Sequence, residues 1–209
     1  TFALATISLN DYCGISDNLL ALRFYNGSGS SYSFYDPGFI IDDISISATP
    51  NFESFNNLVI NKSGGSLQLN CALYSENDFE ISAGTFNANG KYMEFKGDFT
   101  NNGTYTHGNN EVRFTGSSSQ NINGSQDIEF YDFIKNGFGE LIIGDAVSEI
   151  NVEASNSFKW INNADQITVG NGTSTNFTIN DNLYIQQNCT LSTQNASTVS
   201  VEQHYKNFG

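Results

Sequence analysis

The chain has 209 residues, 38% of them hydrophobic, so it can bury the core of one large domain or two small ones. Its 22 acidic residues against 8 basic ones give a net charge of −14, which would repel nucleic-acid phosphates and anionic lipid surfaces. No run of about 18 apolar residues could cross a membrane, so we expect neither nucleic-acid binding nor membrane insertion.

Residues 1–48 read as three strands joined by turns rich in Asp, Gly and Ser. The apolar runs are Phe2–Leu9, Leu19–Tyr25 and Phe39–Ile46. The last run resembles the closing strand of the jelly-roll modules found in bacterial adhesins and carbohydrate-binding proteins. The resemblance implies that residues 1–48 are the C-terminal part of a jelly-roll β-sandwich. Pro50, which stops a strand, marks the boundary to a second region at residues 49–209.

Acidic residues gather near the end of this first segment. Asp36, Asp42 and Asp43, with Asp11 earlier, offer the hard oxygen ligands that Ca²⁺ prefers. The jelly-roll modules that the segment resembles often hold a structural Ca²⁺. We therefore predict a calcium site at Asp36, Asp42 and Asp43, and no other cofactor is indicated. The alternative is an acidic strand edge that discourages aggregation.

A repeat of about 20 residues organises the middle of the chain. Phe79–Phe95 can be laid over Phe99–Phe114; within each copy apolar and polar residues alternate, and Asn/Gly pairs mark the corners. A short coil cannot bury its apolar side until another coil stacks on it. The pattern therefore predicts an all-β fold, a parallel β-helix or β-solenoid over residues 49–209. We expect about eight turns and almost no helix.

The repeat also assigns each side chain to the inside or the outside of the coil. Glu94 falls over Arg113, which predicts an exposed ion pair between neighbouring turns. Corner Asn residues are expected to adopt left-handed conformations and to hydrogen-bond along the stack. These are Asn87, Asn89, Asn101, Asn102, Asn109 and Asn110. The predicted inward residues are Phe79, Ile81, Phe86, Met93, Phe95, Phe99, Tyr105, Val112 and Phe114.

Residues 140–209 keep the strand pattern with less regular spacing. Residues 198–209 lie over residues 92–103, so the chain stops partway through another unit. Because an uncapped turn exposes unpaired backbone, we expect that the protein continues or that a partner covers this end. Strands are predicted at Glu140–Ile143, Ile150–Val152, Ile167–Val169, Phe177–Ile179 and Leu183–Ile185.

A longer unit of about 75 residues overlies the short repeat, because Phe55–Lys62 returns as Phe130–Asn136. Residues 55–137 resemble the repetitive β-helical region of large surface proteins exported by the bacterial type IX secretion system. The resemblance rests on Phe55–Lys62, Gly84–Asn87, Phe99–Tyr105 and Val112–Gln120. It implies a secreted or surface-anchored mosaic protein with adhesive roles.

Asp78 and Asp98 are the candidates for a catalytic pair. They lie one period apart, and paired carboxylates on an outer face could cleave a polysaccharide. An acidic outer face gives the same spacing, and we favour that interpretation. His107 and His204 read as solvated polar residues and not as bases or metal ligands.

The three cysteines are Cys13, Cys71 and Cys189, an odd number that argues mildly against a disulfide scaffold. On a solenoid Cys71 and Cys189 would lie roughly 28 Å apart at about 4.8 Å per turn. A disulfide requires Cα atoms within about 7 Å. We expect two buried thiols without metal partners.

Together these features predict a non-catalytic segment of a large bacterial protein that acts as a structural stalk or adhesive surface. An acidic, Lys-poor chain rich in Asn, Ser, Thr and Gly is typical of secreted and cell-surface proteins, so we expect an extracellular location. The expected partners are other domains of the same parent protein, surface glycans, or a secretion or surface complex. The alternative is a carbohydrate-active enzyme or glycan-binding β-helix module, with a groove lined by outward aromatic and acidic side chains.

Overall fold

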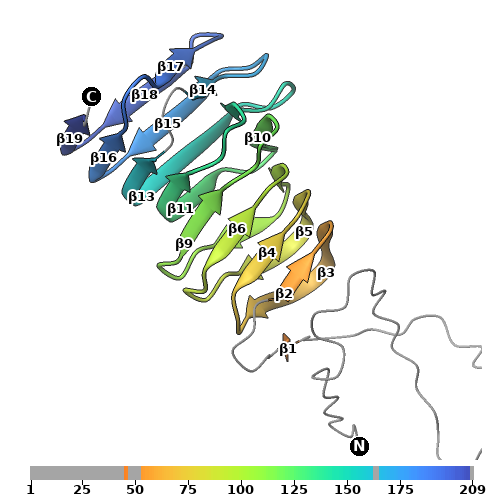
Figure 1. Ribbon diagram of the computed structural model, residues 1–209. Coiled ribbons are helices and arrows are strands. Elements are labelled where there is room, and N and C mark those ends of the chain that lie inside the picture. The colour runs from red at the N-terminus through yellow and green to blue at the C-terminus, as the bar shows by residue number, and fades with distance from the viewer. Residues whose placement is uncertain (1–44, 47–52, 162–164, 208–209) are drawn as a thin grey trace, which may run out of the picture.

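The computed structural model describes residues 45–46, 53–161 and 165–207, and every regular element within them is a β-strand. The strands are parallel and stack along one axis as a solenoid of about seven turns (Figure 1). The predicted all-β parallel solenoid is therefore confirmed. Within the same residues no helix is long and apolar enough to span a membrane.

Two sheets hold the strands, one of nine and one of ten. The first contains β1 (Ser45–Ile46), β3 (Leu58–Leu69), β5 (Phe79–Asn87), β7 (Phe99–Asn101), β8 (Thr104–Thr106), β10 (Gln120–Gly124), β12 (Leu141–Ile143), β14 (Gln166–Val169) and β17 (Thr190–Thr193). The second contains β2 (Glu53–Phe55), β4 (Leu73–Ser75), β6 (Met93–Phe95), β9 (Glu111–Phe114), β11 (Ile128–Lys135), β13 (Ile150–Trp160), β15 (Thr175–Ile179), β16 (Asn182–Ile185), β18 (Thr198–Val201) and β19 (His204–Asn207).

The coil has three faces, because long strands bend from one face to the next. β5 pairs with β7 through Phe79–Ile81 and with β8 through Thr85–Asn87, while β6 of the same turn lies in the other sheet. Farther along, β13 pairs with both β15 and β16. One turn therefore supplies three strand segments, each with its own inward side chains.

The solenoid has about seven turns and not the predicted eight, because the later turns are longer. Phe79 pairs with Phe99, a step of 20 residues (99 − 79). Leu141 pairs with Ile167, a step of 26 residues (167 − 141). Part of the added length is a bulge in the pairing of β11 with β13, where Tyr131 lies opposite both Ser155 and Asn156, and parallel pairing continues on either side.

The predicted register is confirmed position by position. Phe79 pairs with Phe99, Phe86 with Tyr105, and Met93 with Val112. The first two pairs stack their rings, with centroids 5.3 and 6.3 Å apart. All nine predicted inward residues are buried. Like residues therefore lie over like residues along the axis, and the core is one continuous apolar column.

The longer 75-residue unit does not describe equivalent positions. Leu58–Ile60 belong to β3 in the first sheet, whereas Phe133–Lys135 belong to β11 in the second. Phe55 and Phe130 both belong to the second sheet, but Phe55 lies in line with Lys135 through β4, β6 and β9, so the two passages are out of register. The similarity reflects a shared alternation of apolar and polar residues, which suits a strand on any face.

Corner Asn residues take the predicted left-handed conformation at Asn89 and Asn109, with φ of 52° and 64°. The other predicted corner Asn residues do not. Two of them are buried and bond to neighbouring turns instead: Asn101 donates to the Asp127 carbonyl and Asn110 to the Lys91 carbonyl. Asparagine thus serves both as a turn former and as a buried link between turns.

The N-terminal predictions fall mostly outside the described residues, and the jelly-roll segment stays a prediction. Ser45 and Ile46 are described as β1, which pairs in parallel with Gln68 and Leu69 of β3. The end of the predicted strand Phe39–Ile46 therefore joins the first sheet of the solenoid.

We predict that Phe99→Ala destabilises the solenoid by about 3–5 kcal/mol, because Phe99 is fully buried and its removal leaves a cavity. Phe138→Ala is the matched control, since Phe138 is 81% exposed and should change stability by less than about 0.5 kcal/mol. Urea unfolding followed by far-UV circular dichroism measures both values. Equal stability of the two variants would contradict the stacked core.

Candidate functional site: a buried lysine–aspartate pair at one corner

Asp78 and Asp98, the candidates weighed for a catalytic pair, lie in a ladder of side chains that caps successive turns. Asn57 Oδ1 accepts a hydrogen bond from the Asp78 backbone N–H (3.1 Å), and Asp78 Oδ1 accepts one from the Asp98 N–H (2.9 Å). Asp98 Oδ1 then accepts from the Asn121 N–H at 2.8 Å. Each acidic side chain satisfies the backbone at the start of the next strand. Asp78 and Asp98 are therefore engaged in linking turns.

A second ladder of the same kind begins at Asp127. Its Oδ1 accepts from the Asn151 backbone N–H at 2.8 Å, and Asn151 Oδ1 accepts from Asn176 Nδ2 at 3.0 Å. Thr198 continues the ladder by donating its hydroxyl to Asn176 Oδ1 at 2.7 Å. These side-chain hydrogen bonds thus join successive turns on the outside of the coil, in the same order as the strand pairing joins them.

The predicted ion pair between Glu94 and Arg113 does not form, although the two residues are register partners. Arg113 Nε donates instead to Glu111 Oε1 at 2.8 Å, and its guanidinium lies 5.6 Å from the centre of the Tyr92 ring. Glu94 accepts hydrogen bonds from Tyr92 and Thr115. Glu111 and Arg113 are two residues apart on one strand, so their side chains lie on the same face of the sheet. Arg113 therefore pairs within its own strand and not with the neighbouring turn.

The histidines make surface contacts. His107 Nε2 lies 3.2 Å from Glu129 Oε1, and its ring stacks on Tyr131 with centroids 5.7 Å apart. His204 Nδ1 lies 3.5 Å from Asp181 Oδ1. Neither pairing places a nucleophile beside the imidazole.

The predicted calcium ligands Asp36, Asp42 and Asp43 lie outside the described residues. Among residues 53–161 and 165–207, no group of three or more His, Cys, Asp or Glu side chains is placed to hold a metal ion.

Lys135 is the exceptional residue of the core. In β11 Phe133 and Lys135 face inward, because side chains alternate along a strand. Lys135 pairs in register with Phe114 on one side and Trp160 on the other, and its side chain is 0% exposed. A cation thus occupies an inward position whose neighbours are aromatic.

The Lys135 ammonium is paired with Asp165, which precedes β14 in the next turn. Lys135 Nζ lies 2.7 Å from Asp165 Oδ2 and donates to the Gly137 carbonyl at 2.5 Å. Asp165 Oδ1 accepts from the Gln166 backbone N–H at 2.8 Å. Burial lowers the pKa of Lys135, although Asp165 opposes this by stabilising the charged form.

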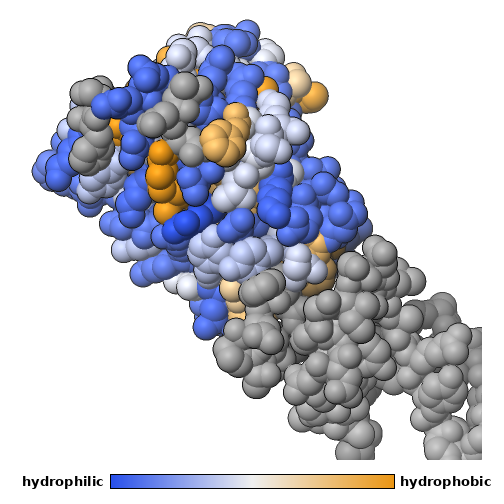
Figure 2. All heavy atoms as spheres, viewed as in Figure 1, coloured by the Kyte–Doolittle hydropathy of each residue, from blue (hydrophilic) through white to orange (hydrophobic). Residues whose placement is uncertain are grey.

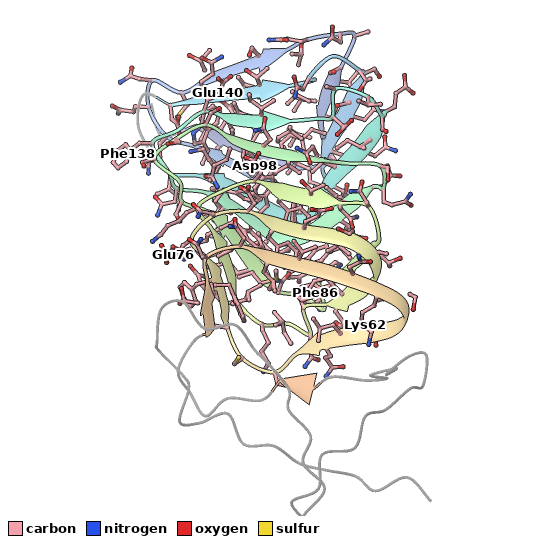
Figure 3. The ribbon with its side chains drawn as sticks, turned by 90° about the vertical axis from the view of Figure 1, so that its right-hand side faces the viewer. Lys62, Glu76, Phe86, Asp98, Phe138 and Glu140 are labelled. Atoms are coloured by element: carbon pink, nitrogen blue, oxygen red, sulfur yellow. The ribbon has the colours of Figure 1, made fainter. Side chains whose placement is uncertain are left out.

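The same corner carries two closely stacked loops, residues 115–119 and 136–140. A Cβ atom on Gly137 or Gly139 would collide with the backbone of the loop below, at Gly116 and Ser118. Between these glycines Phe138 projects away from the coil and is exposed, along the same edge as Glu76 of an earlier turn (Figure 3).

A hollow of about 260 Å³ lies beside this corner. Its lining is almost entirely apolar and is formed by Lys159, Trp160, Ile161, Tyr184, Ile185 and Gln186. Ile161 in this lining is exposed, and so is Phe138 in the loop that follows Lys135. The corner therefore brings together a buried ion pair, a hollow and an exposed aromatic ring.

The sequence analysis did not identify Lys135–Asp165, although Lys135 follows Phe133 at the spacing of an inward residue. It also predicted that Cys71 and Cys189 are buried, whereas both are half-buried. Thr190, the next residue after Cys189, donates its backbone N–H to the Asp165 carbonyl at 2.9 Å, so Cys189 lies beside this corner.

Comparisons of the chain with protein-family models, with curated proteins and with solved structures found no match.

We predict that Asp98→Ala lowers the free energy of unfolding by about 1–2 kcal/mol, because the Asn121 backbone N–H loses its acceptor. Asp98→Asn keeps an acceptor oxygen and should cost less. Equilibrium urea unfolding measures the difference. The capping role would be wrong if the two substitutions were equivalent or if Ala had no effect.

We predict that Lys135→Met alone destabilises the fold by about 3–5 kcal/mol, because it leaves the Asp165 carboxylate buried without its cation. The double variant Lys135→Met/Asp165→Leu should recover part of this loss, since both charges are then absent. Lys159→Met is the control on the neighbouring strand, where the side chain is half-exposed. Guanidinium unfolding compares the three variants, and a double variant less stable than the single one would contradict the coupling.

Proposed function

We propose that this chain is a rigid, non-catalytic segment of a large secreted or cell-surface bacterial protein, and that it serves as a structural stalk or adhesive surface. In this proposal the parent protein is a substrate of the type IX secretion system. Its partners are other domains of that protein, surface glycans, or a secretion or surface complex.

The observation that carries the proposal is the uninterrupted core. Inward side chains of each turn pack on those of the next, and from Leu58 to Val199 they form one connected hydrophobic core. About seven turns give a rod of about 34 Å at about 4.8 Å per turn. A rod whose every turn is held by its neighbours resists bending, which is what a spacer requires.

The outside of the rod supports the same role. The visible surface is mostly hydrophilic, with small, separate hydrophobic groups (Figure 2). The most suggestive acidic pair, Asp78 and Asp98, accepts backbone hydrogen bonds. The acidic exterior therefore contributes to solubility and to links between turns.

Rigidity can be measured with two spin labels at exposed Glu76 and Glu202, after replacing the cysteines by serine. We predict one narrow distribution of the distance between the two labels, measured by pulsed electron–electron double resonance, because both sites are fixed to one stacked core. Added soluble polysaccharides should leave that distance unchanged. The unfolded chain in guanidinium is the control for a broad distribution.

Two outcomes would overturn the proposal. A broad or multiple distance distribution in native buffer would exclude a rigid spacer. Saturable polysaccharide cleavage that Asp98→Ala abolishes, while the circular dichroism spectrum stays intact, would identify the alternative, a carbohydrate-active enzyme.

A further inference from the structure

We propose that the Lys135 amine and the Asp165 carboxyl group condense to an amide, which joins two consecutive turns of the solenoid covalently. The two groups already touch, with Nζ 2.7 Å from Oδ2, and both side chains are almost completely buried. They are 30 residues apart in the sequence (165 − 135), and Asp165 precedes β14, the strand stacked on β12 of the turn that follows Lys135.

The surroundings of the carboxyl group assign different roles to its two oxygens. Oδ1 accepts a hydrogen bond from the Gln166 backbone N–H at 2.8 Å, so negative charge that develops there is stabilised. Oδ2 is close to Nζ but has no well-aligned hydrogen bond, although its surface is buried. Oδ2 is thus the oxygen that can leave.

The surroundings of the amine suit the product. Nζ donates to the Gly137 carbonyl at 2.5 Å, and an amide N–H in the same place would keep that acceptor. Phe114 and Trp160 lie on either side of Lys135 in the stack, and burial favours the uncharged amine. Cys189 and Asp165 are the ionisable groups that affect Lys135.

The reaction needs no oxidant, cofactor or second substrate. The ammonium first gives a proton to Oδ2, which leaves a neutral amine beside a neutral carboxylic acid. The Nζ lone pair attacks Cγ, and charge builds on Oδ1 against the Gln166 N–H. A second proton passes from Nζ to Oδ2, the Cγ–Oδ2 bond breaks, and one water molecule is released.

The amide removes the main cost of this site. A buried ion pair retains much of the desolvation penalty of two charges, whereas an amide is neutral and needs only its N–H and C=O satisfied. Gly137 and Gln166 already provide those partners. Fixed proximity supplies the high effective concentration that an uncatalysed condensation requires.

Mass spectrometry of the denatured, purified chain tests the proposal directly. We expect a mass lower than the sequence mass by one water molecule. Trypsin should fail to cleave after Lys135, and fragmentation should show the Lys135 peptide joined to the peptide that contains Asp165. Lys135→Arg should restore the full mass, whereas Lys159→Arg, the matched control on β13, should keep the loss.

A measured mass equal to the sequence mass, with normal tryptic cleavage after Lys135, would contradict the proposed cross-link. A water loss that maps to other residues, such as an Asn or Asp in a turn, would overturn it as well. If Lys135→Arg fails to fold, the peptide map of the unsubstituted chain still decides the question.

Discussion

Each turn of this solenoid can bury its inward side chains only against the turns on either side. Phe79, Phe99 and their counterparts gain their burial from parallel, in-register stacking and not from a separate layer of structure. Every other feature is subject to that constraint. Longer turns add residues in loops and also as bulges within paired strands, as in β3–β5 and β11–β13, and parallel pairing resumes after each bulge.

Polar side chains obey the same geometry on the outside. The ladders that start at Asn57 and at Asp127 connect each turn to the next through side chain to backbone bonds. Because such bonds satisfy backbone groups at strand entrances, they favour one register over a slipped one. Acidic residues that resemble a catalytic pair in the sequence thus have a structural explanation as links between turns.

Much of the fold could be predicted because the repeat of Phe79–Phe95 in Phe99–Phe114 states the register directly. The alternation of apolar residues also located β12, β14, β15 and β16. What the pattern could not supply was the register between distant turns, so it laid Phe55–Lys62 over Phe130–Asn136, whereas Phe55 lies in line with Lys135. Nor could it pair Lys135 with Asp165, because that contact depends on a turn of unequal length. The calcium residues Asp36, Asp42 and Asp43 stay predictions.

The glycines at positions 137 and 139 have a consequence for how this corner can vary. Because neither position tolerates a side chain, the path of the loop is dictated by the backbone beneath it. The residue between them touches little of the rod and is free of that restriction. Related molecules could therefore carry another side chain at position 138, and so contact a different partner at this corner, while the path of the loop stays the same.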